Sequence, residues 1–272
     1  MPGRSTDTYL FIDGEYLRLI YVSAMQRVFQ VDGEINFDWI KQQARAKRAF
    51  LYDCIDDERR SGEVEADFLQ RVEAQESYFR KIGDLNGFHI RQGSLRGSPK
   101  KRRQKEVDVL LAVDMLTHGY DGNMEKAVLL AGDLDFRPVV EALVRRGVFV
   151  EIWYEPKSAA VELPGAADYG RGLDFISIYE WGTDQFKSVC QIPRSNHQTN
   201  PEIGGAATLR VGQHQGRNVY LMKQDASFNF LLRVEWNHGL AWYAHADKDI
   251  LERYFTTVFG PITWSPKVFA NA

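Results

Sequence analysis

Four aspartates stand at positions where α/β proteins carry out chemistry. Asp133 and Asp135 follow the apolar run AVLLAG, and Asp13 ends the strand-like run TYLFI. Asp108 begins an apolar helical pattern directly after a basic segment. In open α/β sheets, ligands bind outside the carboxyl ends of the strands. We therefore expect Asp13 and Asp133, which end two strands, to converge at one edge of a parallel sheet.

Carboxylates gathered at such an edge repel one another and are usually stabilised by a cation. Hard divalent cations such as Mg²⁺ and Mn²⁺ prefer oxygen ligands and suit phosphate chemistry, because they activate water and bind phosphoryl oxygens. Taken singly, the acids have simpler interpretations: Asp13 followed by Gly14 is typical of a turn, and Asp108 of a helix N-cap or first turn. Their joint occurrence favours a metal site, and no arrangement of Ser, His or Cys suggests a competing nucleophile.

Two further groups belong to the predicted helix 107–119 or precede it. Asp114 shares an apolar stripe with Val107 and Leu111, where an unpaired buried charge would be costly. It either pairs with a basic group or supports the metal site from beneath. The segment before the helix is a basic run, expected to be a loop, made of Lys100, Lys101, Arg102, Arg103 and Lys105. Basic runs are most often solvated, but this one precedes Asp108 and is predicted to grip a nucleic-acid backbone.

Strand and helix patterns alternate along residues 7–182. Strands are predicted at residues 8–13, 49–55, 87–93, 127–131 and 148–153. Helices are predicted up to about residue 29, at residues 36–47, 65–81 and 107–119, and before Gly147. This alternation predicts a three-layer α/β/α domain around a parallel sheet, with right-handed crossover connections.

A different composition begins after this domain. Residues 191–206 are rich in Pro, Gly, Asn and Ser, so we predict a domain at 1–185, a linker at 186–206 and a small β-rich α+β module at 207–272. Alternating apolar and polar residues with Gly turns predict antiparallel hairpins, closed by a helix at ILERYFTTVFG. The module mixes aromatic and basic residues, namely Trp236, Trp242, Tyr243 and Trp264 with Arg210, Arg217, Lys223 and Arg233. Such residues can stack on unpaired bases, although an ordinary β core is the favoured interpretation.

Three segments occur in the order found in NYN domains: LFIDGEY, KEVDVLLAVDML and LLAGDLDFRPVVEALVRRGVFVEIW, followed by LDFISI. The chain resembles this family, which comprises PIN-like metal-dependent ribonucleases and includes the LabA-like bacterial group, over about residues 7–180. The resemblance implies a PIN-like fold and Mg²⁺- or Mn²⁺-dependent hydrolysis of RNA phosphodiester bonds, leaving a 5′-phosphate and a 3′-hydroxyl. It makes the chain a metal-dependent phosphodiester hydrolase.

The resemblance also assigns roles to individual residues. Asp13, Asp108 and Asp133 match the family's acidic residues and would hold one or two cations. Asp135 matches the second acid of the Gly-Asp-x-Asp-Phe motif and would complete the shell or orient a water. One position departs from the family, because Tyr16 stands where an Asn amide could orient water, phosphate or a carboxylate.

Two alternative functions remain. The first is a catalytically weak or inactive PIN-like module that binds RNA or a protein partner, which the departure at Tyr16 keeps open. The second is a phosphatase or phosphotransferase on a similar sheet. Phosphatases of that kind usually place Asp-x-Asp after the first strand, and Glu15 breaks this pattern.

Composition agrees with a cytoplasmic globular protein and predicts no membrane partner. Hydrophobic residues make up 44% and charged residues 26% of the 272 residues, and no apolar run approaches the roughly 20 residues of a membrane span. Asp13 interrupts the first apolar run, unlike in a signal peptide, and Cys54 and Cys190 suit reduced thiols. The net charge of −3 excludes a globally basic binder but not a local patch. RNA, or single-stranded nucleic acid generally, is the expected partner, and a homo-oligomer is left open.

Overall fold

The computed structural model describes residues 7–93, 100–196, 206–224, 229–237 and 239–268, apart from the side chains of 100–105, 267 and 268. The chain forms two compact units. The first consists of Met1–Tyr21 and Ile35–Trp181, and the second of Val22–Glu34 and Gly182–Ala272. Of the described helices, none is both long and apolar enough to cross a membrane.

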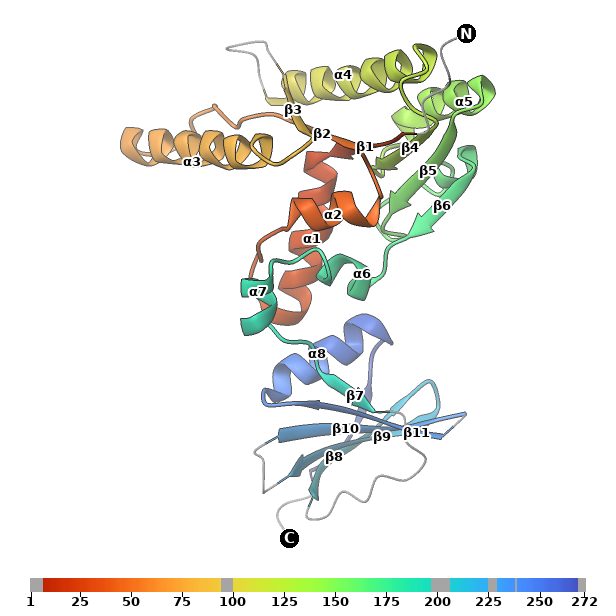
Figure 1. The fold of residues 1–272 in the computed structure, drawn as a ribbon. Coiled ribbons are helices and arrows are strands. Elements are labelled where there is room, and N and C mark those ends of the chain that lie inside the picture. The colour runs from red at the N-terminus through yellow and green to blue at the C-terminus, as the bar shows by residue number, and fades with distance from the viewer. Residues whose placement is uncertain (1–6, 94–99, 197–205, 225–228, 238, 269–272) are drawn as a thin grey trace. The chain divides into compact units, whose positions relative to one another are not determined.

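The first unit is built on a six-stranded parallel sheet with the strand order β3-β2-β1-β4-β5-β6 (Figure 1). Its strands are β1 (Thr8–Asp13), β2 (Arg48–Asp53), β3 (Phe88–Gln92), β4 (Lys126–Leu130), β5 (Phe149–Tyr154) and β6 (Tyr169–Gly172). Each neighbouring pair of strands runs parallel. The prediction of an α/β domain with a parallel sheet is therefore confirmed.

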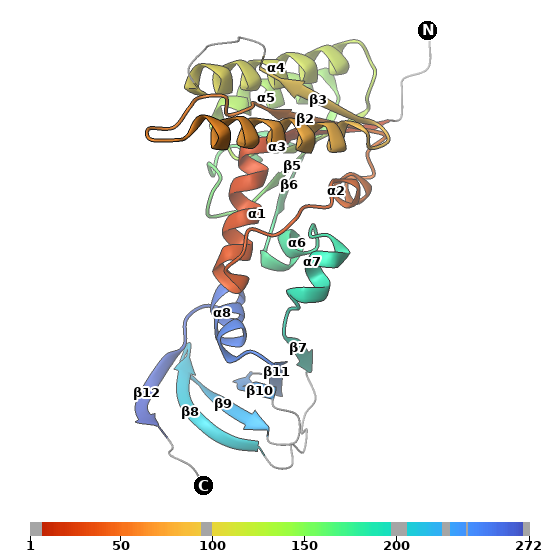
Figure 2. The same ribbon diagram turned by 90° about the vertical axis from the view of Figure 1, so that its left-hand side faces the viewer.

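Helices cover both faces of this sheet (Figures 1 and 2). They are α1 (Gly14–Phe29), α2 (Phe37–Gln43), α3 (Glu65–Gly83), α4 (Lys100–Tyr120), α5 (Arg137–Arg146) and α6 (Phe175–Tyr179), with two short 3-10 helices, η1 (Leu134–Phe136) and η2 (Pro164–Ala166). From α4 and α5, Leu111, Met115 and Val140 share one core with Phe11 and Phe50 of the sheet. The opposite face is covered by α1, α2 and α6. These layers form the predicted three-layer arrangement.

The strands are continuous apolar runs because helices cover the sheet on both sides. The residues from Tyr9 to Ile12 are all buried, and so are those from Ala127 to Leu130. Such runs are typical of parallel strands, which lose contact with water on both faces. In β1 and β4 the polar side chains are therefore confined to the strand ends, as at Asp13.

The strand order brings three carboxyl ends together. β1 lies between β2 and β4, with Asp13 opposite Tyr52 and Ile12 opposite Leu130. The chain passes from β1 to β2 on one side and later returns to β4 on the other, so the order reverses at β1. Ligands of open α/β sheets bind in the crevice at such a switch point. Asp13, Asp53 and the segment after Leu130 therefore share the edge of the sheet that is suited to a site.

Two predicted elements differ from the structure. The basic run expected to be a loop is the beginning of α4, so Asp108 lies two turns inside the helix and does not open it. Lys, Arg and Gln are good helix formers, and no Gly or Pro separates Lys100 from Val107, so the helix extends through the run. The edge strand β6 was not predicted, because its sequence YGRG is half glycine and has a low strand propensity.

The second unit contains an antiparallel sheet with the order β12-β8-β9-β10-β11-β7. Its elements are α7 (Asp184–Val189), β7 (Arg194–Asn196), β8 (Ala206–His214), β9 (Arg217–Gln224), β10 (Asn229–Trp236), β11 (Gly239–His245), α8 (Lys248–Val258) and β12 (Thr263–Val268). The predicted hairpins are β8–β9 and β10–β11. The predicted closing helix is α8, but β12 follows it, and β7 lies inside the range predicted as a linker.

Aromatic residues form much of the core of the second unit. Phe255 of α8 is fully buried, and its ring lies 5.3 Å from His214 and 5.8 Å from Tyr243 between ring centres. Trp242 is 7% exposed. Such burial favours the ordinary β core over base stacking for Trp242 and Tyr243.

Candidate active site

Asp13 stands at the junction between β1 and α1. The backbone N–H of Tyr16 donates to its Oδ1 at 3.1 Å, as in a helix cap. Burial, with the nearby charges of Asp108, Glu15 and Asp53, raises the pKa of Asp13 to about 7 despite that hydrogen bond.

Asp108 approaches the same place from α4. Burial is the main cause that raises its pKa to about 6, and the charges of Asp133, Glu15 and Asp135 add to the shift. The charge of Asp108 contributes to the raised pKa of Asp13, and the charge of Asp133 contributes to that of Asp108. These acids, from β1, α4 and the end of β4, therefore influence one another in pairs.

A pocket with a volume of about 430 Å³ opens beside Asp13 and Asp108, which both line it. The residues after β2 and part of α3 complete its wall, including Arg60 and Tyr78. Asp133 and Asp135 do not line this pocket, and both side chains are exposed. Two of the predicted acids thus share a cavity, while the other two lie outside it.

Asp133 has a local structural role as well. Its Oδ1 accepts a hydrogen bond from the backbone N–H of Asp135 at 2.9 Å, and this caps η1. The capping bond explains the two-residue spacing of the acids, because it keeps the Asp133 carboxylate over the first turn.

The Tyr16 side chain is engaged with residues that follow β4 and β5. Its hydroxyl accepts a hydrogen bond from the backbone N–H of Glu155 at 2.8 Å and lies 3.4 Å from the hydroxyl of Ser158. Its ring lies so close to Gly132 that a Cβ added there would come within 2.3 Å of it. Tyr16 therefore joins the ends of β1, β4 and β5, and its backbone N–H binds the predicted catalytic residue Asp13.

Asp114 pairs with a basic group. Its Oδ2 lies 2.9 Å from Nε of Arg91 and accepts a hydrogen bond from the Tyr52 hydroxyl at 2.9 Å. Burial, and then the charge of Asp114, raises the pKa of Tyr52, so this hydroxyl stays a donor. Of the two roles considered for Asp114, the structure shows the ion pair, and it reaches the pocket only through Tyr52, which lines it.

Asp53 is a carboxylate that the sequence analysis missed. It ends β2 as Asp13 ends β1, it lines the pocket, and its side chain is only 3% exposed. Arg18 forms a two-pronged ion pair with it, with Nη2 at 3.1 Å from Oδ1 and Nη1 on Oδ2. A Cβ at Gly14 would come within 2.6 Å of Asp53 Oδ2, so glycine is required there. The rule that drew attention to Asp13, an acid at a strand end, could have found it.

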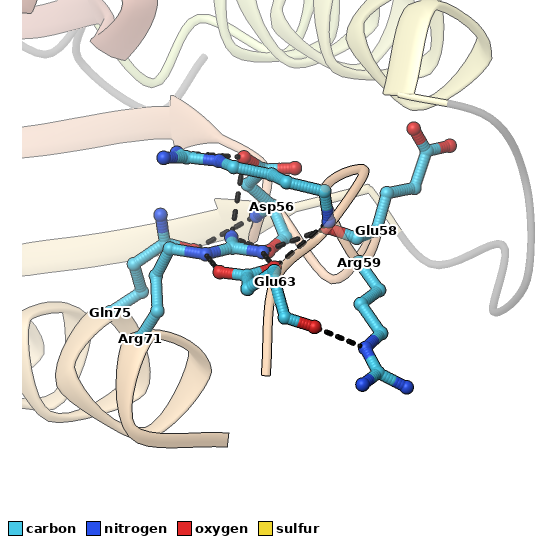
Figure 3. A network of polar contacts seen from close by, with 7 residues as sticks. Asp56, Glu58, Arg59, Glu63, Arg71 and Gln75 are labelled. Carbon is cyan, nitrogen blue, oxygen red and sulfur yellow. Dashed lines mark hydrogen bonds and ion pairs between the residues drawn. The ribbon is translucent and has the colours of Figure 1, made fainter. Parts of the chain in front are cut away.

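A second group of charges surrounds Arg71 of α3 (Figure 3). Its Nε and Nη2 donate to the two carboxylate oxygens of Glu63 at 2.8 and 3.0 Å. Nη2 also donates to the Glu58 carbonyl at 2.8 Å, and Nη1 lies 3.2 Å from Oδ2 of Asp56. The hydrogen bonds that Glu63 accepts from Arg71, and then the one from the backbone N–H of Arg60, lower the pKa of Glu63 to about 2. We call this set of contacts the Arg71 clamp, and it fixes the loop that follows β2 against α3.

The acids fit a divalent cation in chemistry. Asp13 and Asp108 form no ion pair with any residue whose side chain the structure describes, and their raised pKa values reflect burial and repulsion that a bound cation would offset. Their oxygens are the ligands that Mg²⁺ and Mn²⁺ prefer. Within the described ranges, no three His, Cys, Asp or Glu residues are grouped closely enough to hold a metal ion. The side chains of the basic run, Lys100 to Lys105, lie outside the described residues.

Comparison with known families agrees with this geometry. The sequence matches the NYN domain over residues 7–173, more than half of the chain, which confirms the resemblance. The match ends before the second unit's antiparallel sheet. No curated protein matched the sequence.

Proposed function

The chain belongs to the NYN domain family, a branch of the PIN-like nucleases, and from this premise we propose that it is a metal-dependent ribonuclease that hydrolyses RNA phosphodiester bonds. The observation that carries the proposal is the pair of partly buried carboxyls, Asp13 and Asp108, that share a pocket at the switch point of the sheet. A desolvated acid pair with no basic partner among the described side chains destabilises a fold, so its presence favours a ligand.

In the proposed mechanism, Asp13, Asp108 and Asp133 would hold Mg²⁺ or Mn²⁺. The bound cation would activate a water and offset the charge that develops on the phosphate. Asp13 and Asp108 would bind it as carboxylates, and the bound charge would counter the burial that raises their pKa values. Asp135, which is exposed two residues after Asp133, would orient the attacking water. The basic run at the start of α4 would contact the RNA backbone.

Tyr16 bears on the alternative of an inactive binding module. The family's Asn amide is missing, but the Tyr16 side chain is engaged with Glu155 and Gly132, and all four acids are present. Tyr16 supports the turn that carries Asp133, so we interpret it as part of the scaffold of an active enzyme. We also propose a cytoplasmic location, in keeping with the two widely separated cysteines.

The test is hydrolysis of a generic single-stranded RNA by the full chain with Mn²⁺, compared between wild type and Asp133→Asn. We expect turnover in the wild type and its loss in the variant. Asp184→Asn is the matched control, because its side chain is 98% exposed and far from the acids in sequence. Mn²⁺ binding measured by calorimetry gives a second readout. Full activity of Asp133→Asn would remove the assignment, and RNA binding without Mn²⁺ binding would favour the inactive module.

A further inference from the structure

The pocket beside Asp13 and Asp108 also has a wall that these acids do not explain. This wall contains Arg60, from the loop after β2, and Tyr78 of α3. Two other arginines, Arg18 and Arg71, line the pocket as well. A cavity that is acidic on one side and presents arginine and an aromatic ring on the other is suited to a ligand that carries both phosphate and a flat base.

Two of the three arginines already have their hydrogen bonds filled. Arg18 is paired through two nitrogens with the buried Asp53, and Arg71 is at the centre of the clamp with Glu63. Recruiting either guanidinium to a ligand would leave a carboxylate without its partner. Both are therefore structural.

Arg60 is different, because its side chain is 66% exposed and its nearest described carboxylate oxygen, on Asp56, is 3.6 Å away. Its backbone is nevertheless fixed, since its N–H donates to Oε2 of Glu63 at 2.9 Å. Glu63 is held in turn by Arg71, so the Arg71 clamp helps to fix the backbone that carries Arg60. A guanidinium on a fixed backbone with donors to spare is a suitable phosphate ligand.

Tyr78 supplies the aromatic surface. It is 36% exposed and lines the pocket, and Phe37 packs edge-on against it at 6.0 Å between ring centres. Burial raises its pKa to about 12, so the ring is neutral at physiological pH. A partly exposed, supported and neutral ring can stack on a base of any identity.

We propose that this pocket is a subsite for one unpaired nucleotide next to the acids, with its phosphate at Arg60 and its base against Tyr78. The inference rests on the proposed function, because a nucleotide in this subsite would be next to the phosphate that the acids are proposed to cleave. The volume of about 430 Å³ lies within the roughly 300–1,000 Å³ of small-ligand sites, large enough for a nucleotide and too small for a duplex. It follows that the substrate must be unpaired at this position.

The test measures binding of a labelled single-stranded RNA octamer to the full chain in EDTA, by fluorescence anisotropy over a range of salt concentrations. Arg60→Ala should weaken binding and reduce the salt slope by about 0.7, the value for one phosphate contact with a single strand. Tyr78→Leu should weaken binding by about 5- to 100-fold, as expected for the loss of one stacked base. Tyr78→Phe should restore wild-type binding, and a duplex of the same sequence should bind more weakly than the single strand.

Arg59→Ala is the matched control. Arg59 is the neighbour of Arg60 and carries the same charge, but it pairs with Glu65 at 3.0 Å and does not line the pocket. Equal losses in the Arg59 and Arg60 variants, or an unchanged salt slope for Arg60→Ala, would overturn the subsite. So would wild-type affinity in Tyr78→Leu. Thermal unfolding of each variant checks that it is folded.

The outcomes separate this subsite from the proposed function. RNA cleavage with Mn²⁺ but no effect of Arg60 or Tyr78 would overturn the subsite and leave the nuclease intact. Binding that depends on Arg60 and Tyr78 without cleavage would support the subsite and reject the nuclease.

Discussion

Two sides of the pocket differ in whether their charged side chains have partners. We call the side with Asp13 and Asp108 the acid wall, and the side with Arg18, Arg60 and Arg71 the arginine wall. On the acid wall, Asp13 and Asp108 have no described basic partner, and their pKa values are raised to about 7 and about 6. On the arginine wall, Asp53 is paired with Arg18, and Arg71 is paired with Glu63, which lies outside the pocket lining. The pKa of Glu63 is lowered to about 2. Carboxyl groups in and beside this pocket therefore have pKa values shifted in opposite directions.

This contrast separates charges that build the fold from charges that await a ligand. A paired carboxylate stabilises the native state at neutral pH, whereas a buried unpaired one destabilises it. Strongly perturbed groups in a cleft are candidates for function for that reason. By this criterion we propose that the acid wall is functional and the arginine wall mostly structural, with Arg60 as the exception.

The largest expected effect is on activity at the acid wall. Asp108→Asn should reduce RNA hydrolysis with Mn²⁺ by more than about 100-fold, because even the loss of an outer partner of a metal ligand typically costs 10- to 100-fold. The variant should fold at least as well as the wild type, since a charge that repels its neighbours has been removed. Rates under saturating Mn²⁺ and thermal unfolding in EDTA measure both effects. Undiminished hydrolysis would place Asp108 among the structural charges.

Breaking the ion pair between Arg18 and Asp53 should lower the stability of the fold and not the catalytic rate directly. Arg18→Met leaves the buried carboxylate of Asp53 without its partner and should lower the free energy of unfolding by about 2 kcal/mol, below the usual cost of a buried pair because Arg18 is 45% exposed. Urea denaturation at pH 7 measures this change. The double variant Arg18→Met with Asp53→Asn should lose less than the sum of the single variants, since neither charge is then stranded. Strict additivity would show that the pair is not coupled.

The raised pKa values of the acid wall predict a pH dependence of stability. Between the usual value of 3.8 and the folded values of about 6 and about 7, the folded state keeps protons that the unfolded chain releases. The contribution of these acids to the free energy of unfolding therefore falls as the pH rises from about 4 to about 7. In EDTA, Asp13→Asn should weaken this fall, and Mn²⁺ should offset it at pH 8 in the wild type. A pH profile of Asp13→Asn that superimposes on the wild type would contradict the assignment.

The lowered pKa of Glu63 predicts the opposite dependence and the smallest effect. Because the folded value of about 2 lies below the usual 4.5, the stabilisation is present above pH 4.5 and is lost as the pH falls toward 2. Glu63→Gln should therefore unfold at a lower temperature than the wild type at pH 7, with the difference shrinking in acid. Differential scanning calorimetry at several pH values measures the difference. A constant difference at all pH values would mean that shape and not charge matters at Glu63.

Much of the fold follows from local patterns. The apolar runs ending at Asp13 and Leu130 became β1 and β4, and Asn36 caps α2 at the start of a predicted helix. Three strands escaped prediction: β6 is an edge strand with two glycines, β7 lies in the predicted linker, and β12 lies beyond the predicted closing helix. Their strand state depends on a neighbouring strand and not on their own propensity.

Less of the candidate site could be predicted. The sequence predicted that Asp13, Asp108 and Asp133 lie near one another; Asp108 contributes to the raised pKa of Asp13, and Asp133 to that of Asp108. Two features could not be predicted from the sequence: Asp133 does not line the pocket, and the Tyr16 side chain contacts Glu155, 139 positions away along the chain. Side-chain directions of this kind depend on packing between elements, which periodicity does not encode.

The sequence by itself determined which residues end the strands, and therefore which acids could meet. Only the tertiary structure decided which of these acids has a basic side chain as its ion-pair partner. Asp13 and Asp53 end neighbouring strands, yet Asp53 has Arg18, 35 positions away along the chain, and Asp13 has no described basic partner. The reason is physical: a strand end is set by local apolar runs, whereas an ion pair needs a distance of a few ångströms that only the folded sheet and its helices provide.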